Sequence, residues 1–501
     1  MNSSHWKAPD IRLLAVAASL LVTLFNLLLR AVPNDDAFTY IRTAEIFLEQ
    51  GAAAAYANYA WASFAVIIAL LGKILPLDLF TLAVLFNGLW YALLIYAWLG
   101  IVREIDPSPR VMALAVLVIL IFPQLAAFRH EVIRDAGYWA LLFTALWQFI
   151  LFTRSRLTRH VTVYVVCMLG AALFRVEAVI YLVLVPLSLA ADTSGRRIRF
   201  IVAYLTASLL ALLTVWGLLR LAGLDLWQLL TSYLSVYGGF VSEAFFPPPG
   251  RYEELARMLF NEHAADFSGE YLRLILIAGF FLVLLGNLFN GLGAPYMMML
   301  GVGAWKKVLH MPRHVLLPLC ACLLVSLGIL ICFLFITRFL TARYTMVLCL
   351  ALCLLLPVII DRLLKLAAEA GRLRLWRNSI AVLLLYCFLD AYVSFGIDKL
   401  YTMEAAQWAR TQAPSGTVLL TNNHVVAYYS ELVDDYDLTP SHVAAEDITS
   451  AETGSLVIVE YNFDMLQVLQ QPEVASRLQM IAEYPAGEEP RLAIFRRNAN
   501  P

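Results

Sequence analysis

The sequence predicts an all-α polytopic membrane bundle of about eleven transmembrane helices, followed by a small C-terminal α/β domain. Of the 501 residues, 61% are apolar and only 15% are charged, whereas soluble domains are about 45–50% apolar and about 25% charged. The apolar residues form near-continuous runs rather than alternating segments, which favours spanning helices over a β-barrel. The composition excludes a soluble enzyme, a disordered chain and a nucleic-acid-binding protein.

Eleven apolar runs approach the roughly 20 residues that a spanning helix needs. The first is longer than the roughly 7–15 apolar residues of a cleaved signal peptide and lacks a cleavage site, so we expect it to be an uncleaved first span. Two further segments, Ala60–Leu75 and Ala294–Ala304, are predicted to be interfacial or re-entrant, and a thirteen-span arrangement is the alternative. The eleven runs lie at about 11–32, 79–102, 111–127, 137–153, 161–174, 177–191, 198–221, 271–289, 314–336, 344–361 and 378–396.

The distribution of charge predicts which ends of these spans face the cytoplasm. The segment 222–270 has two Arg against seven acidic residues, and the tail 397–501 has six basic and fifteen acidic residues. Because Lys and Arg concentrate in short cytoplasmic loops, we expect a cytoplasmic N-terminus and an extracytoplasmic C-terminal domain. The short segments that are then cytoplasmic carry 18 of the 36 basic residues, at 7–12, 103–110, 154–159, 196–199, 306–313 and 362–377.

The predicted organisation is a transmembrane domain over 1–396, with outer-face loops at 33–78, 128–137 and 222–270, and an extracytoplasmic domain over 397–501. Residues with alternating character in the tail favour three strands, and intervening polar segments favour three short helices. The expected strands are Thr417–Thr421, Ser455–Glu460 and Arg491–Arg496, and the expected helices are Thr402–Arg410, Ser441–Asp447 and Asp464–Gln470.

Two adjacent acids, Asp35 and Asp36, directly follow the first span. Asn34 or Asp35 can cap a helix that runs to about residue 50, with Gly51 as its end. On that helix Asp36 and Tyr40 share a face. Acids at a helix start are favoured by the helix dipole alone, so the pair is either a solvated helix start or a pair of catalytic groups.

The second outer loop is also dense in charge. Glu131 and Asp135 are four residues apart and share a face if the segment is helical. They are either a salt-bridged span end or a second acidic wall facing the first loop. A divalent cation such as Mg or Mn could bridge the two acidic loops, but the sequence has no chelating motif, so no cofactor is certain.

Arginines recur at the outer ends of several spans, at Arg134, Arg175, Arg338 and Arg343. Single arginines at such depths commonly anchor a helix by extending toward the headgroups. With Arg42 in the first loop, four outer segments supply arginine at one depth, which instead suits a bilayer-embedded phosphate that arginine binds bidentately.

Three short patterns resemble those of the GT-C superfamily of multi-span glycosyltransferases, in the bacterial ArnT/PMT-like branch. They are Asp-Asp-Ala-Phe-x-x-x-Arg-x-Ala at 35–44, Arg-Asp-x-Gly-Tyr at 134–138, and Ala-Arg-Tyr at 342–344 followed by apolar residues and Pro357. These patterns cover about thirty residues, whereas the plan of spans followed by an outer domain covers most of the chain. Asp-Asp stands here where many relatives have Asp-Glu, so the resemblance does not fix which acid is the base.

The resemblance implies an enzyme of the bacterial inner (plasma) membrane and cell envelope that uses a polyprenyl-phosphate-linked sugar. It would be a hexosyl- or pentosyltransferase whose acceptor is an extracytoplasmic glycolipid, polysaccharide or protein, and it would need no nucleic acid. A glycosyl phosphate leaves as a stable anion, so the site must supply a general base for the acceptor and cations for the phosphate, with inversion as the outcome.

The candidate residues divide by role. Asp35, nearest the membrane plane, is the predicted base, with Asp36 as the alternative. The remaining candidates are Glu131 and Asp135 for a second acidic wall or metal; Arg338, Arg343, Arg134 and Arg175 for the donor phosphate; and Tyr40, Arg42, His130 and Glu177 for the acceptor or for support.

Other functions make different demands on the sequence. An O-antigen ligase or polymerase would place its key residues in the long loop, at Arg251, Arg257 and His263. A lipid or sugar flippase would need a polar path across the bundle, and charge within the spans is nearly absent, which counts against transport. A scaffold role would leave the first-loop acids dispensable.

The charge bias predicts that Asp35 and residue 501 lie on the same, outer side of the membrane. Cysteines placed at Ser415 and Ser155 should differ in intact cells: an impermeant thiol reagent should label only the first. The reverse labelling pattern would place the acidic loops inside and overturn the site assignment.

Overall fold

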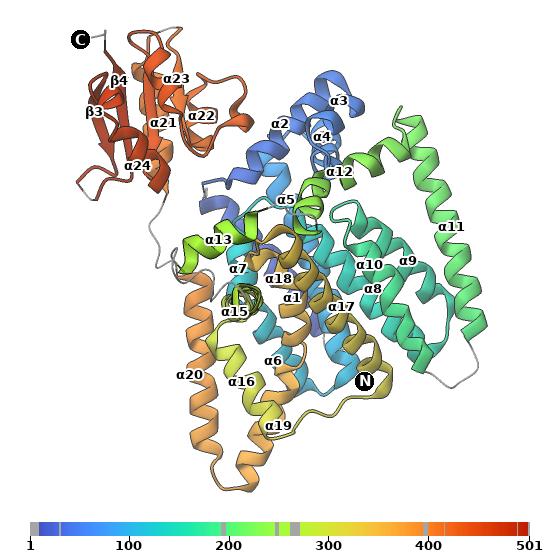
Figure 1. Cartoon of the computed structure of the whole chain (residues 1–501). Helices are drawn as coiled ribbons and strands as arrows, with labels where there is room; N and C mark the ends of the chain where they lie inside the picture. Colours follow the sequence, from blue (N-terminus) through green and yellow to red (C-terminus); the bar gives the residue numbers. More distant parts are fainter. Residues whose placement is uncertain are drawn as a thin grey trace, which may run out of the picture.

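The computed structural model describes residues 10–29, 32–191, 197–245, 250–260, 271–393, 399–414, 416–487 and 489–498. These residues form a helical bundle with a small sheet domain at one end, beyond the upper end of α20 (Leu373–Tyr392) in Figure 1. The bundle helices before α20 are α1 (Ile11–Leu29), α2 (Asp35–Gln50), α3 (Ala52–Asn58), α4 (Ser63–Ile74), α5 (Leu79–Ile105), α6 (Pro109–Leu120), α7 (Pro123–Phe128), α8 (Asp135–Ser155), α9 (Thr158–Ala172), α10 (Ala178–Leu184), η1 (Val185–Ala191), α11 (Arg197–Leu221), α12 (Leu226–Phe245), α13 (Arg251–Phe260), α15 (Leu272–Leu292), α16 (Ala294–Trp305), α17 (Arg313–Thr337), α18 (Ala342–Cys353) and α19 (Leu356–Glu369).

Seven helical segments in the described part of the chain are long and apolar enough to cross a membrane: α1, α5, α8, α11, α15, α17 and the continuous stretch Ala342–Glu369. The chain is therefore a multi-pass membrane protein, although the predicted count of eleven spans is not confirmed. The run 111–127 is broken because Pro123 starts a new helix, α7, after α6 has ended at Leu120. The run 177–191 is likewise divided between α10 and the 3-10 helix η1. The two segments expected at the interface form α4 and α16, each of 12 residues.

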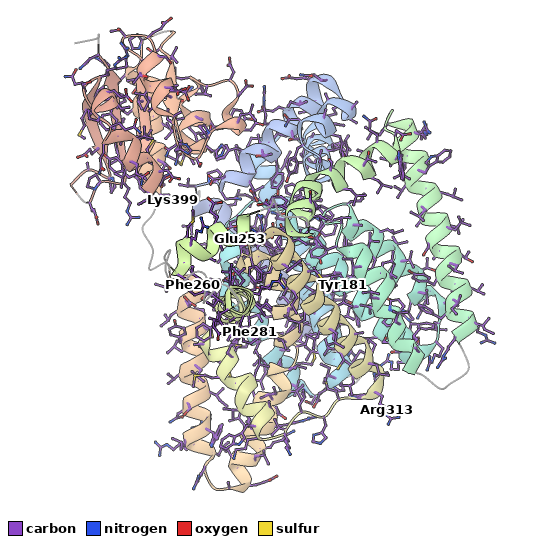
Figure 2. All side chains as sticks on the ribbon, viewed as in Figure 1. Tyr181, Glu253, Phe260, Phe281, Arg313 and Lys399 are labelled. Atoms are coloured by element: carbon purple, nitrogen blue, oxygen red, sulfur yellow. The ribbon has the colours of Figure 1, made fainter. Side chains whose placement is uncertain are left out.

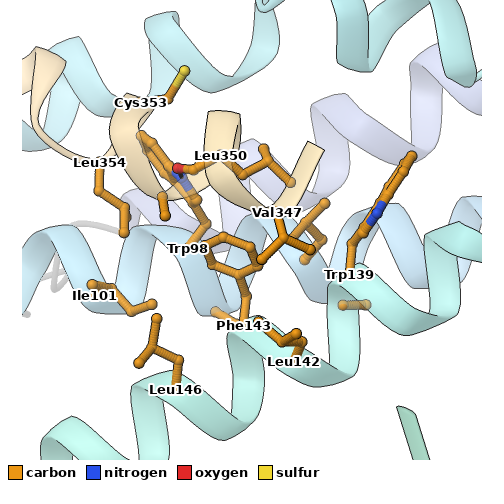
Figure 3. Close-up of a cluster of buried hydrophobic side chains, with 14 of the residues drawn as sticks. Trp98, Ile101, Trp139, Leu142, Phe143, Leu146, Val347, Leu350, Cys353 and Leu354 are labelled. Carbon is orange, nitrogen blue, oxygen red and sulfur yellow. Dashed lines mark hydrogen bonds between the residues drawn. The ribbon is translucent and has the colours of Figure 1, made fainter. Parts of the chain in front are cut away.

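The bundle core is formed where α5, α8 and α18 meet, around Trp98, Phe143 and Leu350 (Figure 3). Trp98 is fully buried, and its indole Nε1 donates a hydrogen bond of 2.9 Å to the Leu350 carbonyl. Leu350 lies in the last turn of α18, where carbonyl groups lack an intrahelical donor. The tryptophan therefore satisfies a helix end inside the core and fixes α18, which carries site residues at its other end.

The C-terminal domain contains a four-stranded sheet of order β1-β2-β4-β3, in which β1 and β2 are parallel and the other pairs are antiparallel. Three of its strands match the predicted ones, but β3 is absent from the prediction because this edge strand is largely exposed and mixes polar with apolar residues. The helix expected at Ser441–Asp447 begins later, at Ala445. The elements are α21 (Leu400–Gln412), β1 (Leu419–Thr421), α22 (His424–Ser430), η3 (Tyr436–Leu438), α23 (Ala445–Ser450), β2 (Leu456–Glu460), α24 (Phe463–Leu469), α25 (Pro472–Ala475), β3 (Leu478–Tyr484) and β4 (Leu492–Arg497).

This domain packs against α2, the helix that starts with the two first-loop acids. Phe38 of α2 is fully buried in a cluster that includes Tyr428 and Tyr436 of the domain. The Tyr436 hydroxyl donates to Glu45 at 2.8 Å, and Arg42 lies 3.6 Å from Asp435. The domain therefore holds one face of α2 while the bundle holds the other.

Candidate functional site

The first-loop helix is joined to the second outer loop by one side chain. Asn34 occupies the predicted N-cap position of α2, and Gly51 ends the helix as predicted, but the Asn34 side chain does not cap it. Its Oδ1 accepts from the Val132 N–H at 2.8 Å, and its Nδ2 donates to the Val132 carbonyl at 3.3 Å. This two-point contact brings Asp36 toward Asp135, the first residue of α8.

A buried ion network lies at the start of α8. Asp135 is 1% exposed and accepts a 2.6 Å hydrogen bond from Nη1 of Arg175. Nη2 of Arg175 donates to Glu177 at 2.6 Å. Burial opposes ionisation of Glu177, but the attraction of Arg175 outweighs it and lowers the pKa of that carboxyl below its ordinary value. One guanidinium thus holds two carboxylates.

Arg343, in the first turn of α18, extends this network to the first loop. Its Nη1 donates to Asp36, and its Nε lies 3.7 Å from Asp135. The structure therefore brings together residues from four separate outer segments that the sequence singled out. Asp36 is half-buried in this network, whereas Asp35 is exposed and has no hydrogen bond or ion pair among the described residues.

Aromatic rings hold the arginines of the site in place. The Arg175 guanidinium lies 4.4 Å from the ring centre of Tyr344, a separation at which a cation is attracted by the ring. Arg134 lies 4.5 Å from the ring of Trp61. Its buried Nη1 has no hydrogen-bond partner within the part of the chain that the structure describes. Arg134 is thus a third cation of the site, and one without a carboxylate partner. Tyr344 belongs to the Ala-Arg-Tyr pattern at 342–344, whereas no sequence pattern singled out Trp61.

A narrow pocket of about 20 Å³ opens beside this network, and its lining has a charged part and a largely apolar part. Arg175, Glu177 and Arg343 form the charged part, and three tyrosines also line the pocket. One of these, Tyr181, is labelled among the bundle side chains in Figure 2. The rest of the lining is almost entirely apolar and comes from α17 and α18: Ser326, Ile329, Leu330, Phe333, Val347 and Leu348. Such a pocket suits an anionic head attached to an apolar chain.

The other sequence candidates make different contacts. The side chains of Arg338 and His130 are exposed and have no hydrogen bond or ion pair among the described residues. Arg42 binds the C-terminal domain. Tyr40 is buried against Tyr59 and Phe64, close enough to Asp36 and Arg343 to interact with their charges. Of the residues that a ligase or polymerase would use, His263 lies outside the described residues, as does the Arg251 side chain; Arg257 is in α13.

The carboxyl of Glu131 interacts with the charges of the buried ion network. Burial raises the pKa of its carboxyl above the ordinary value, the charge of Arg343 lowers it, and the charges of Asp36 and Asp135 raise it further. Its backbone carbonyl lies 3.5 Å from the Asn87 amide, which ties the loop to α5.

The acidic residues of the site do not form a metal-binding set. Within the described ranges, no three His, Cys, Asp or Glu side chains gather at one point. The charges of Asp36 and Asp135 are met by Arg343 and Arg175 instead. Both carboxylates are therefore paired with guanidinium groups in this structure.

The fold resembles two solved membrane proteins. ArnT from Cupriavidus metallidurans, a crystal structure in the apo state, aligns with a TM-score of 0.50 and 13% identity over 96% of this chain and 97% of that chain. The archaeal oligosaccharyltransferase AglB from Archaeoglobus fulgidus, solved with an inhibitory peptide and a dolichol-phosphate, aligns with a TM-score of 0.54 and 14% identity over 99% of this chain and 75% of that chain. No family model and no curated protein matches the chain by sequence.

Both solved proteins are glycosyltransferases of the GT-C superfamily. The likeness extends over nearly the whole of this chain, through the bundle and the C-terminal domain. The chain therefore has the GT-C fold, which confirms the fold that its sequence motifs predicted.

Replacing Arg175 with Met should destabilise the protein strongly. Glu177 would lose its partner and buried Asp135 would keep only the longer contact with Arg343, and breaking a buried ion pair typically costs about 3–5 kcal/mol. Thermal unfolding of the purified protein in detergent measures the effect. R338M is the matched control, because Arg338 is exposed, and its midpoint should stay near that of the wild type. Equal midpoints for the two variants would contradict a structural role for the network.

Proposed function

We propose that the chain is an integral-membrane glycosyltransferase that moves a sugar from a polyprenyl-phosphate donor to an extracytoplasmic acceptor. The observation that carries the proposal is the pocket in which two arginines and a carboxylate meet an apolar wall. The GT-C fold supports the same reading, and AglB was solved with a dolichol-phosphate, a lipid of this chemical class. In this arrangement 1–396 is the transferase domain, and 397–501 is an extracytoplasmic domain that packs against its acidic helix.

The donor binds with its phosphate at the charged part of the pocket. Arg175 and Arg343 supply guanidinium donors that match phosphate oxygens. The prenyl chain lies against apolar residues of α17 and α18, which are spanning helices. A lipid can enter such a site from the bilayer without leaving the hydrocarbon phase.

Asp36 is the general base in this proposal. It lies in the same network as the pocket arginines, whereas Asp35 is exposed and points about 100° away on the helix. The sequence analysis favoured Asp35 instead, because Asp35 lies nearer the first span. Before the donor binds, Arg343 donates a hydrogen bond to the Asp36 carboxylate. The donor phosphate competes for Arg343, so donor binding frees the carboxylate to accept a proton.

The reaction then balances as a single displacement. The acceptor oxygen attacks the anomeric carbon, and its proton passes to Asp36. The bond between the anomeric carbon and the phosphate oxygen breaks, and the polyprenyl phosphate leaves with the electron pair, stabilised by Arg175 and Arg343. The anomeric configuration inverts. The acceptor is an extracytoplasmic glycolipid, polysaccharide or protein.

A membrane assay with a radiolabelled polyprenyl-phosphate sugar tests the function directly. Transfer of label to an acceptor without any nucleotide sugar is the expected result. Movement of the lipid between leaflets without transfer would support a flippase instead.

D36N should preserve expression and donor binding but lower turnover by about 10²–10⁴-fold, since the amide keeps the shape of the carboxylate and removes its basicity. D35N is the matched control, one residue away on the exposed side, and should cost much less. Single-turnover transfer from labelled donor measures both. If D35N is the inactive variant, Asp35 rather than Asp36 is the general base. If both variants transfer normally, Glu131 and Asp135 become the candidates.

R343M should weaken donor binding by about 1.5–3 kcal/mol, the range for a hydrogen bond to a charged group. The apparent KM for the polyprenyl-phosphate sugar is the measurement. R338M removes an arginine that follows the end of α17, only five residues away, but does not line the pocket, so its KM should not change. An effect confined to R338M would move the phosphate site to that helix end.

A further inference from the structure

A second arginine cluster lies at the far end of the same helices. Arg154 is 19 positions after Asp135 on α8, which at about 1.5 Å per residue places it about 29 Å away. The hydrocarbon core of a bilayer is about 30 Å thick. Arg12, at the start of α1, and Arg103, in the last turn of α5, gather at this end with Arg154. The cluster therefore lies at the membrane surface opposite the proposed transfer site.

These three arginines line a cavity of about 290 Å³ between α1, α5 and α8. Nearby carboxylates neutralise the three guanidinium groups to different extents. Arg12 binds Asp10 at 2.6 Å and stacks on Tyr96, and Arg154 lies 2.8 Å from Glu104. Arg103 has only a 3.8 Å contact with Asp10, and its side chain is 54% exposed. Three guanidinium groups thus face two carboxylates, and Arg103 has the weakest partner.

A buried donor in the cavity wall also lacks an acceptor. Nε1 of Trp147 has no hydrogen-bond partner in the described part of the chain, and an unsatisfied buried donor costs about 1–3 kcal/mol. A Cβ at Gly100 would come within 2.6 Å of the Trp147 ring, so only glycine admits the indole at this position. Trp147 and Gly100 both line the cavity. An excess of cations and an unpaired N–H in one cavity call for an anion with oxygen acceptors.

We propose that this cavity binds the phosphate of an anionic lipid headgroup in the leaflet opposite the transfer site. Arg103 and Arg154 bind the phosphate, and the Trp147 indole donates to one of its oxygens. An apolar path for the acyl chains adjoins it: Leu13 and Leu14 of α1 are exposed next to Arg12, and Leu151 forms part of the wall. This path and the depth of the cluster favour a lipid over a free anion. The site is independent of the proposed transfer chemistry.

Thermal unfolding of the purified full-length protein in detergent tests the proposal with three probes: phosphatidylglycerol, diacylglycerol and inorganic phosphate. Phosphatidylglycerol should raise the midpoint of the wild type in a saturable way, because a ligand of the folded state alone stabilises it. Diacylglycerol, which lacks the phosphate, should have no effect. Stabilisation by inorganic phosphate at the same concentrations would overturn the choice of a lipid.

Single substitutions test whether phosphatidylglycerol acts through this cavity. R103Q should weaken the apparent affinity for phosphatidylglycerol by about tenfold or more, corresponding to about 1.4 kcal/mol. W147F keeps the ring beside Gly100 but removes the N–H, and it should weaken binding less. R374Q is the matched control, because Arg374 is an exposed arginine in the first turn of α20 that lies outside the cavity. Equal affinities in wild type, R103Q and W147F would overturn the proposal, as would an equal loss in R374Q.

Discussion

The buried pair of Arg175 and Asp135 is the interaction on which the geometry of the candidate site depends. Removing two charges from water costs several kcal/mol each, and only close geometry with further hydrogen bonds offsets that cost. Here the offset comes from a second carboxylate, Glu177, on the same guanidinium, and from Arg343 on the far side of Asp135. The network needs the start of α8, the α9–α10 turn and the start of α18 to meet at one place, so it links the packing of the bundle to the geometry of the site.

Arginine in this site balances charge in the ligand-free protein and, in our proposal, binds the substrate. A guanidinium can bind a phosphate through two parallel hydrogen bonds. Sharing Arg343 between Asp36 and the donor would therefore release the Asp36 carboxylate only when the donor is bound.

Two other parts of the fold set where this chemistry takes place. The C-terminal domain fixes α2 from outside the bundle through Phe38, Glu45 and Arg42. Helix α8 runs from Asp135 at one end to the Arg154 cluster at the other. A lipid bound at that lower cluster would hold α1, α5 and α8 at a defined depth, and the depth of α8 sets the depth of the upper site. Arg134, stacked on Trp61, adds one further cation beside the reacting groups, and its Nη1 has no hydrogen-bond partner among the described residues.

The sequence by itself determined the membrane bundle, the sheet domain and the segments from which the site is built. Near-continuous apolar runs have few alternative structures. The paired acids after the first span, like the Arg-Asp and Ala-Arg-Tyr patterns, are contiguous in the sequence and can be recognised there. Local signals could not choose between neighbouring residues. Asp36 rather than Asp35 meets Arg343, Arg343 rather than Arg338 lines the pocket, and Asn34 binds Val132 instead of capping its own helix. Those outcomes depend on which way each side chain points from its helix. They also depend on contacts between residues that are mostly far apart in the sequence. Only the packed structure determines the two together. The break at Pro123 is different, because proline is a local signal that starts a new helix.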